Sequence, residues 1–235
     1  MTKIIESLTM KTLAIIPAYN EEDCLVGTVE LLKEELPQQD FLIVDDGSSD
    51  KTKQICIDNN YSYISLPVNT GLTSAFQAGM KYAYRNNYDA AYQFDADGQH
   101  LPSYLPKMAQ AMIDNDADIV IASRFINGEK PTGARGVGSN LISSLIKQTT
   151  GIKIYDPTSG LRLYSRRLIK LYAEGFDITP EPDTVALLVR HGAKVIEIPA
   201  QMQERQGGES YLNLPNIIAY MSRTCMSLIL FQWFR

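Results

Sequence analysis

The 235-residue sequence contains only three cysteines and two histidines, and it has no excess of positive charge. Cys24, Cys56 and Cys225 match neither a zinc-binding spacing nor a disulfide framework, so we expect a reducing cytosol as the compartment. The formal net charge of −5 argues against a nucleic-acid-coating protein, because no basic field is present to hold phosphate backbones. His100 and His191 have no serine or cysteine partner at a recognisable spacing, which leaves a nucleophilic triad without support.

The glycine signatures of nucleotide binding are missing as well. No G-x-G-x-x-G follows the first apolar run, and no G-x-x-x-x-G-K-[ST] occurs in the sequence. A bound diphosphate would therefore have to be neutralised by a metal ion and by arginines. Arg124, Arg162 and Arg205 are the candidates, because a planar guanidinium binds two phosphate oxygens at once. Residues 1–10 lack the apolar segment of a signal peptide, and we expect a disordered leader there.

Short apolar runs alternate with segments of helical periodicity, and the length suits one domain. The predicted strands, apolar on both faces, are 12–16, 41–44, 90–94, 118–122 and 194–198. The predicted helices are 21–36 with Asn20 as N-cap, one opening at Ser49–Asp50, one from Thr70 to about Asn86, and one from Pro102–Ser103. This alternation predicts an α/β fold with three layers and a mostly parallel central sheet.

Polar loops follow three of these strands, with the sequences AYNEE, DDGSSD and DADGQH. In such a sheet ligands bind beyond the carboxyl ends of the strands. Asp95 and Asp97 are two residues apart in extended chain, so both carboxylates point the same way and repel each other unless a cation lies between them. Oxygen ligands suit Mg²⁺ or Mn²⁺, and Gln99 would add a neutral oxygen. The alternative is an ordinary turn cap.

The loops after the first and second strands carry groups suited to a nucleoside. Asp45 or Asp46 could accept hydrogen bonds from a ribose or a base, and Gly47 allows a close backbone approach. The alternative is that one of these two acids caps the following helix. In the loop after the first strand, the ring of Tyr19 could stack on a base, although packing within the loop is equally compatible with a tyrosine.

Seven motifs occur in one order across residues 15–210: IIPAYNEE, VDDGSSD, NTGLTSA, DADGQH, SRF, DPTSGLR and RQGGES. This set resembles the family 2 inverting glycosyltransferases of the GT-A fold, closest to the dolichyl- and polyprenyl-phosphate sugar transferases. Many relatives carry lysine where Tyr211 stands here, and the loop 123–137 is shorter and less basic than in many of them. The implied domain is 11–213, followed by a helix in 214–235.

The resemblance implies a role for each matching residue. The nucleoside would be held by Pro17, Tyr19, Glu21, Val44 and Asp46. The nucleotide sugar would also contact Asp95, Ala96 and Asp97, and the metal ligands would be Asp97, Gln99 and Asp95. The diphosphate or the acceptor phosphate would contact Arg124, Arg205 and Ser210.

The implied reaction moves a hexose or N-acetylhexosamine from a nucleotide diphosphate sugar, with UDP favoured, to polyprenyl phosphate for cell-surface glycan synthesis. A phosphate monoester has a second pKa of about 6 and needs no general base at neutral pH. Transfer to a glycan hydroxyl would need one, and Glu181 or Asp183 would be the candidates; the simpler interpretation of both is the acidic start of a helix. The third alternative is a nucleotide-sugar-binding subunit without catalysis.

The C-terminal segment 214–235 is largely apolar but carries Arg223 near its middle, which makes a membrane span costly. A helix lying in the membrane interface, with Trp233 at headgroup depth, fits better. The alternative is a helix packed on the sheet. We expect the protein to act at the cytoplasmic face of the membrane, anchored by a small membrane-protein partner or by a homo-oligomer interface on this helix.

Overall fold

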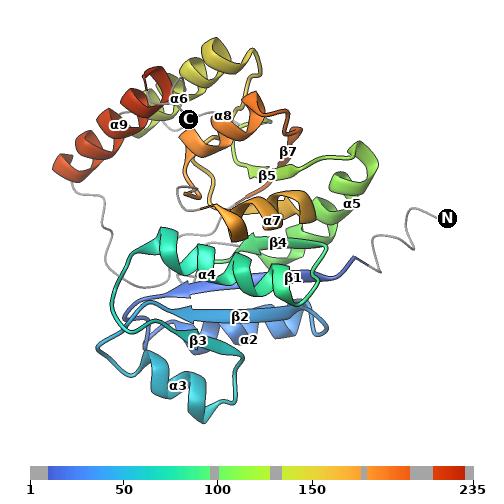
Figure 1. The fold of residues 1–235 in the computed structure, drawn as a ribbon, viewed down its shortest axis with the longest axis vertical. Helices are drawn as coiled ribbons and strands as arrows, with labels where there is room; N and C mark the ends of the chain where they lie inside the picture. The colour runs from blue at the N-terminus through green and yellow to red at the C-terminus, as the bar shows by residue number, and fades with distance from the viewer. Residues whose placement is uncertain (1–9, 96–100, 128–133, 176–178, 202–213, 231–235) are drawn as a thin grey trace.

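A seven-stranded sheet forms the centre of the computed structural model, which describes residues 10–95, 101–127, 134–175, 179–201 and 214–230 (Figure 1). The strands are β1 (Thr12–Ala18), β2 (Asp40–Asp45), β3 (Tyr63–Ser65), β4 (Ala90–Gln93), β5 (Ile119–Ser123), β6 (Arg162–Ser165) and β7 (Val195–Pro199). Their order across the sheet is β3-β2-β1-β4-β6-β5-β7. Every pairing is parallel except those of β6, which runs antiparallel between β4 and β5. The predicted mostly parallel sheet is confirmed.

The five predicted strands are all present, and each of their ends lies within two residues of the predicted one. Two further strands were not predicted. Strand β3 has only three residues, all half-buried, so it leaves no apolar run in the sequence. Strand β6 begins with Arg162, whose charge masks the strand in a hydropathy pattern although the residue is 3% exposed.

Helices cover both faces of the sheet, as the three-layer prediction requires. They are α2 (Leu25–Glu35), α3 (Thr52–Asp58), α4 (Leu72–Arg85), the 3₁₀ turn η1 (Pro102–Tyr104), α5 (Leu105–Asn115), α6 (Ala134–Thr150), α7 (Arg166–Glu174), α8 (Pro182–Arg190) and α9 (Leu214–Ile229). One core cluster joins the sheet to α4, α6, α7, α8 and α9, and the other joins it to α2, α3 and α5. Each face therefore has its own buried apolar layer.

The predicted start at Pro102 is confirmed by η1, and the predicted starts of α3 and α4 lie two to three residues before Thr52 and Leu72. The predicted start of α2 is wrong. Helix α2 begins at Leu25 and not near Asn20. Asn20 adopts a left-handed backbone with φ of 56°, and its side chain accepts hydrogen bonds from Ser49 in the loop after β2. Helix α4 lies close to the sheet at Gly79, where an added Cβ atom would sit 2.3 Å from a side-chain carbon of Ile15. Glycine is therefore required at this contact.

The last helix packs on the body of the protein. Helix α9 contacts α6 and α8, and its Thr224 and Leu228 are buried. Met226, Ile229 and Leu230 are about half exposed, so apolar side chains also face outward. Within the described residues, no helix combines the length and the apolar character that a membrane crossing requires. Trp233 and Arg235 lie outside the described residues.

Candidate functional site

The loops that follow β1 and β2 are joined at the carboxyl edge of the sheet. The backbone N–H of Asn20 donates to Ser48 Oγ at 3.0 Å, and Asn20 Oδ1 accepts from the N–H of Ser49 at 2.9 Å. Glu21 donates its N–H to Thr52 Oγ1 at 2.8 Å. The side chain of Asn20 thus bridges two loops, which explains why it does not cap α2.

A second set of bonds ties the same loops through two acids. The N–H of Glu22 donates to Asp50 Oδ2 at 3.1 Å, and Glu22 Oε2 accepts from the N–H of Lys51 at 3.0 Å. Partial burial opposes ionisation of Asp50, but hydrogen bonds from Thr52 and Glu22 outweigh it and hold the pKa of this carboxyl below its ordinary value. The two loops form one connected platform.

The first two acids of DDGSSD make different contacts, and neither caps α3, the helix that follows them. Asp45 accepts from the Ser48 N–H and the Ser65 hydroxyl, at 3.0 and 2.7 Å. Asp46, 3% exposed, accepts from the N–H and hydroxyl of Thr70 and from the N–H of Gly71. Asp46 therefore anchors the start of α4, and the expected capping of α3 by either acid is wrong. A nucleoside contact by Asp46 would add to three existing bonds.

The other residues expected to hold the nucleoside lie along the same edge. Pro17 pairs with Val44 in the β1–β2 register, and Tyr19 follows directly after β1. Pro17, Tyr19 and Glu21 are half-buried, whereas the side chain of Val44 is fully buried in the core. Any contact of Val44 with a ligand would have to use its main chain.

The acidic motif after β4 is only partly within the described residues. Asp95 follows β4 and its Oδ1 accepts from Gln93 Nε2 at 2.6 Å. Ala96, Asp97 and Gln99 lie outside the described residues. Among the described residues, no three His, Cys, Asp or Glu side chains form a group that could hold a metal ion.

A charged cluster at the end of β5 includes a residue whose role the sequence did not reveal. Arg124 binds Asp156 in two-point fashion, with Nε–Oδ2 at 2.7 Å and Nη2–Oδ1 at 2.8 Å. Arg124 also donates its N–H to Asp156 and Nη2 to Thr158 Oγ1. The Asp156 side chain is fully buried and that of Arg124 is 33% exposed. Asp156, the first residue of the DPTSG motif, thus fixes the side chain of Arg124 from the SRF motif.

Arg162 does not belong to this site. It starts β6, is 3% exposed, and donates to the carbonyl oxygens of Pro157 and Pro180 at 2.7 and 3.0 Å. The prediction that Arg162 binds a diphosphate is wrong, because its guanidinium is buried and already donates to backbone carbonyl oxygens. Arg205 and Ser210 lie outside the described residues.

The two acids considered as a general base lie at the start of α8 and contact α9. Glu181 is the N-cap residue and lies 4.0 Å from Arg223, and Asp183 is in the first turn. Asp183 Oδ2 accepts from the hydroxyl of Ser227 at 2.5 Å. The carboxylate of Asp183 is thus already engaged with a hydrogen-bond donor.

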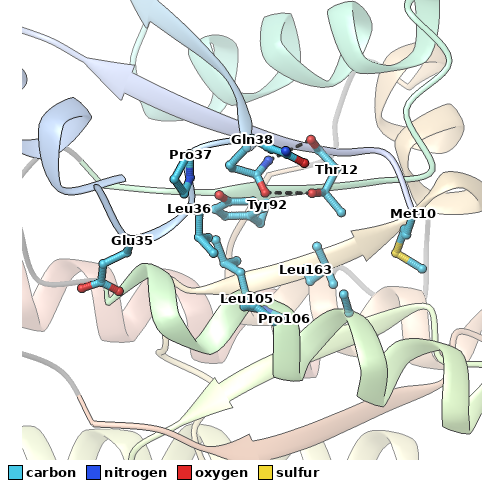
Figure 2. A pocket seen from close by; sticks show the side chains of 12 residues that line it. Met10, Thr12, Glu35, Leu36, Pro37, Gln38, Tyr92, Leu105, Pro106 and Leu163 are labelled. Atoms are coloured by element: carbon cyan, nitrogen blue, oxygen red, sulfur yellow. Dashed lines mark hydrogen bonds between the residues drawn. The ribbon is translucent and has the colours of Figure 1, made fainter. Parts of the chain in front are cut away.

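A cavity of about 410 Å³ lies away from this site (Figure 2). Its lining includes Thr12 at the start of β1 and Gln39 just before β2, so it opens at the amino edge of the sheet. Tyr92 of β4 also lines it, and the buried Tyr92 hydroxyl has no hydrogen-bond partner among the described residues. The cavity and the predicted ligand residues are at opposite edges.

Comparison with known proteins reveals likeness over most of the chain. Residues 13–172 match the model of glycosyl transferase family 2. The chain is 32% identical over 222 residues to an undecaprenyl-phosphate mannosyltransferase of Micrococcus luteus, covering 87% of this chain and 88% of the relative. It is also 32% identical over 180 residues to a UDP-N-acetylglucosamine–dolichyl-phosphate N-acetylglucosaminyltransferase of Methanococcus voltae, covering 68% and 71%.

A solved structure shares the fold. Glucosyl-3-phosphoglycerate synthase of Mycobacterium tuberculosis, crystallised with Mn²⁺, UDP-glucose and phosphoglyceric acid, superposes with a TM-score of 0.70. The match covers 97% of this chain and 81% of that one at 16% identity. The predicted GT-A arrangement of helices and sheet is therefore confirmed.

Proposed function

The chain belongs to glycosyl transferase family 2, and from this premise we propose that it moves a hexose or N-acetylhexosamine from a nucleotide diphosphate sugar to a polyprenyl phosphate. The observation that carries the proposal is the likeness to an undecaprenyl-phosphate mannosyltransferase over 87% of this chain. UDP is the favoured nucleotide, and cell-surface glycan synthesis is the process that such a lipid-linked sugar would serve.

The joined loops at the carboxyl edge support a nucleotide site. Tyr19 and Glu21 lie on the platform made by the loops after β1 and β2, and Asp46 fixes the loop before α4 to it. A platform held by side-chain bonds from several elements keeps its shape before a ligand arrives, which lowers the cost of ordering on binding. The nucleoside would lie on this platform, with its diphosphate toward the end of β4.

The residues after β4 fit a divalent metal ion. Asp95 is a carboxylate directly beyond the strand, and Asp97 and Gln99 supply further oxygen donors, the ligand type that Mg²⁺ and Mn²⁺ prefer. When bound, such an ion would neutralise the negative charge that builds on the departing diphosphate. The sequence and the position of Asp95 favour this assignment.

The reaction follows from charge and geometry. An oxygen of the acceptor phosphate attacks the anomeric carbon on the face opposite the diphosphate; a new carbon–oxygen bond forms, and the old one breaks with its electron pair leaving on the nucleoside diphosphate. Arg124, fixed on Asp156, would bind phosphate oxygens at the carboxyl edge, and Arg205 would act with it. The attacking phosphate is already ionised, so no proton has to be removed.

The contact between Asp183 and Ser227 favours a phosphate acceptor over a hydroxyl acceptor. A general base must have a lone pair directed at the substrate proton. Asp183 Oδ2 instead accepts the Ser227 hydroxyl at 2.5 Å, within the α8–α9 contact. Transfer to a glycan hydroxyl would have to use the Asp183 lone pairs that the Ser227 hydroxyl does not occupy.

The exposed apolar side chains of α9 support a position at the membrane surface. Met226 and Ile229 of α9 are each 49% exposed, and Leu230 directly after it is 50% exposed. Leu141 of α6, the helix packed against α9, is 47% exposed. A polyprenyl phosphate is held in the membrane with its phosphate at the surface. We place α9 in the interface, where it would bring the carboxyl edge to this phosphate.

The proposed function is tested with a matrix of donors and acceptors. Purified protein is incubated with labelled UDP-glucose, UDP-N-acetylglucosamine or GDP-mannose, with Mn²⁺ or EDTA, and with either undecaprenyl phosphate in detergent micelles or an oligosaccharide acceptor. Metal-dependent label in the organic phase, lost in Asp97→Asn, is expected for one donor. Label that enters a glycan acceptor while the lipid fraction stays empty would overturn the proposal.

A further inference from the structure

Glu197 is an acidic residue on an otherwise apolar strand. Strand β7 reads VIEIP, with Ile196 and Ile198 packed on the core of one face and Val195 on that of the other. Side chains alternate along a strand, so Glu197 shares the face of Val195. A carboxylate on such a face costs free energy unless its oxygens accept hydrogen bonds.

Both oxygens of Glu197 accept from consecutive backbone amides. Oε2 accepts from the N–H of Tyr155 at 2.6 Å, and Oε1 accepts from the N–H of Asp156 at 2.8 Å. One carboxylate that binds two successive N–H groups fixes the orientation of the chain between them. The loop that carries DPTSG is thereby fastened to the edge strand of the sheet.

Asp156, whose backbone N–H is held by Glu197, in turn binds Arg124 through its side chain. Its buried carboxylate accepts from the N–H, Nε and Nη2 of Arg124 and from the Thr158 hydroxyl, at 2.7 to 3.1 Å. Arg124 follows β5, and β5 pairs with β7 through Ile121 and Glu197. The two ends of the bonded series therefore rest on neighbouring strands.

We infer that Glu197 is a positioning residue: through Asp156 it holds the guanidinium of Arg124 in the orientation that binds a phosphate group. The inference rests on the proposed function for its phosphate, which is either the donor diphosphate or the acceptor phosphate. A guanidinium on a long side chain has many rotamers, and binding is weakened by the fraction of time spent in the wrong ones. The Glu197 contacts remove that freedom at the loop, one step away from the arginine.

The sharpest variant is Glu197→Gln, which keeps the size of the side chain. A glutamine can accept from one of the two amides but presents its own N–H₂ to the other, so donor faces donor. Asp118→Asn is the matched control, because Asp118 also accepts from a backbone amide, that of Lys194, and also binds an arginine, Arg167, but at the amino edge. Glu197→Asp serves as a milder variant if Glu197→Gln does not fold.

The first readout does not depend on catalysis. Phenylglyoxal modification of individual arginines is followed by mass spectrometry in each folded variant. Glu197→Gln is expected to raise the modification rate of Arg124 by about threefold, the effect of weakening one hydrogen-bonded constraint, with no change at Arg167. Asp118→Asn is expected to raise the modification rate of Arg167 and to leave that of Arg124 unchanged. An unchanged rate at Arg124 would overturn the inference, whatever the enzyme transfers.

The second readout is a double-mutant cycle on the transfer reaction. Arg124→Ala is expected to raise one Michaelis constant, for the donor or for the acceptor phosphate, and Glu197→Gln should raise the same constant by about tenfold. In the Arg124→Ala background, Glu197→Gln should add less than about twofold, because both act through one group. Additive losses, or a loss confined to kcat, would contradict a positioning role. Absence of transfer in the unmodified protein would refute the proposed function alone.

Discussion

Two arginine–aspartate pairs lie at opposite edges of the sheet and have nearly the same geometry. Arg124 and Asp156 meet beyond the end of β5 with nitrogen–oxygen distances of 2.7 and 2.8 Å. Arg167 and Asp118 meet just before the start of β5 at 2.8 and 2.6 Å. In both pairs the carboxylate also accepts a backbone N–H, so each ties separate elements together.

The pairs differ in burial. Asp156 is fully buried and its arginine is 33% exposed, whereas Asp118 and Arg167 are 16% and 54% exposed. An exposed pair contributes little free energy because water competes for both charges, while a buried acid cannot lose its partner without a large penalty. The amino-edge pair is a partly exposed ion pair that links neighbouring elements at the surface. The carboxyl-edge pair presents a fixed arginine where ligands are expected.

The largest expected difference is between the two acids. Asp156→Asn should lower the stability by about 3 kcal/mol and kcat/KM by about 100-fold, because it leaves Arg124 without its buried partner. Asp118→Asn should cost about 1 kcal/mol or less and leave kcat/KM unchanged. Urea unfolding and steady-state kinetics measure both quantities. Equal losses of activity in the two variants would abolish the distinction between the edges.

The two ends of β2 offer a second contrast. Asp46→Asn should raise the KM for the nucleotide sugar about tenfold and cost about 2 kcal/mol, because an amide nitrogen would replace one of the two oxygens that accept from the N–H groups of Thr70 and Gly71. Asp40→Asn, at the amino end of the same strand, changes an exposed acid that binds the Tyr88 hydroxyl. That control should not alter the KM, and a shift in it would show that the two ends are not independent.

The amino-edge pair should be sensitive to acid. The hydrogen bond from Arg167 holds the pKa of Asp118 below its ordinary value, with the Lys194 N–H adding to the effect and partial burial opposing it. A carboxyl whose pKa is lower in the folded state stabilises the fold above its unfolded pKa of about 4, and the benefit is lost as the pH falls further. The stability difference between the unmodified protein and Asp118→Asn should therefore shrink between about pH 4 and pH 2. A constant difference would contradict the assignment.

The smallest effect is expected at the amino-edge cavity. Tyr92→Phe removes a buried hydroxyl that has no partner among the described residues, so the thermal midpoint should stay the same or rise by a few degrees. Transfer activity should be unchanged, since the cavity lies away from the carboxyl edge. A drop in activity without a drop in stability would assign the cavity a role in the reaction.

Much of this organisation could be predicted from the sequence, because apolar strands and the polar loops after them are local patterns. The errors concern residues whose hydrogen-bond partners lie outside their own strand or loop. Asn20 looked like a helix cap, but its side chain bonds 29 residues away at Ser49. Arg162 was predicted as a phosphate ligand, but it lies at the start of β6 and donates to the carbonyl oxygens of two prolines. The task of Glu197 depends on amides 41 and 42 residues earlier, which no spacing within β7 indicates.

The most direct test of a nucleotide-sugar site at the carboxyl edge is hydrogen–deuterium exchange with and without a nucleotide sugar and Mn²⁺. Binding at this edge predicts slower exchange in segments 18–24, 45–52 and 66–71 and around Asp156, with no change in the amino-edge segments 36–40 and 115–119. Protection confined to the amino edge, around the cavity of Figure 2, would contradict it.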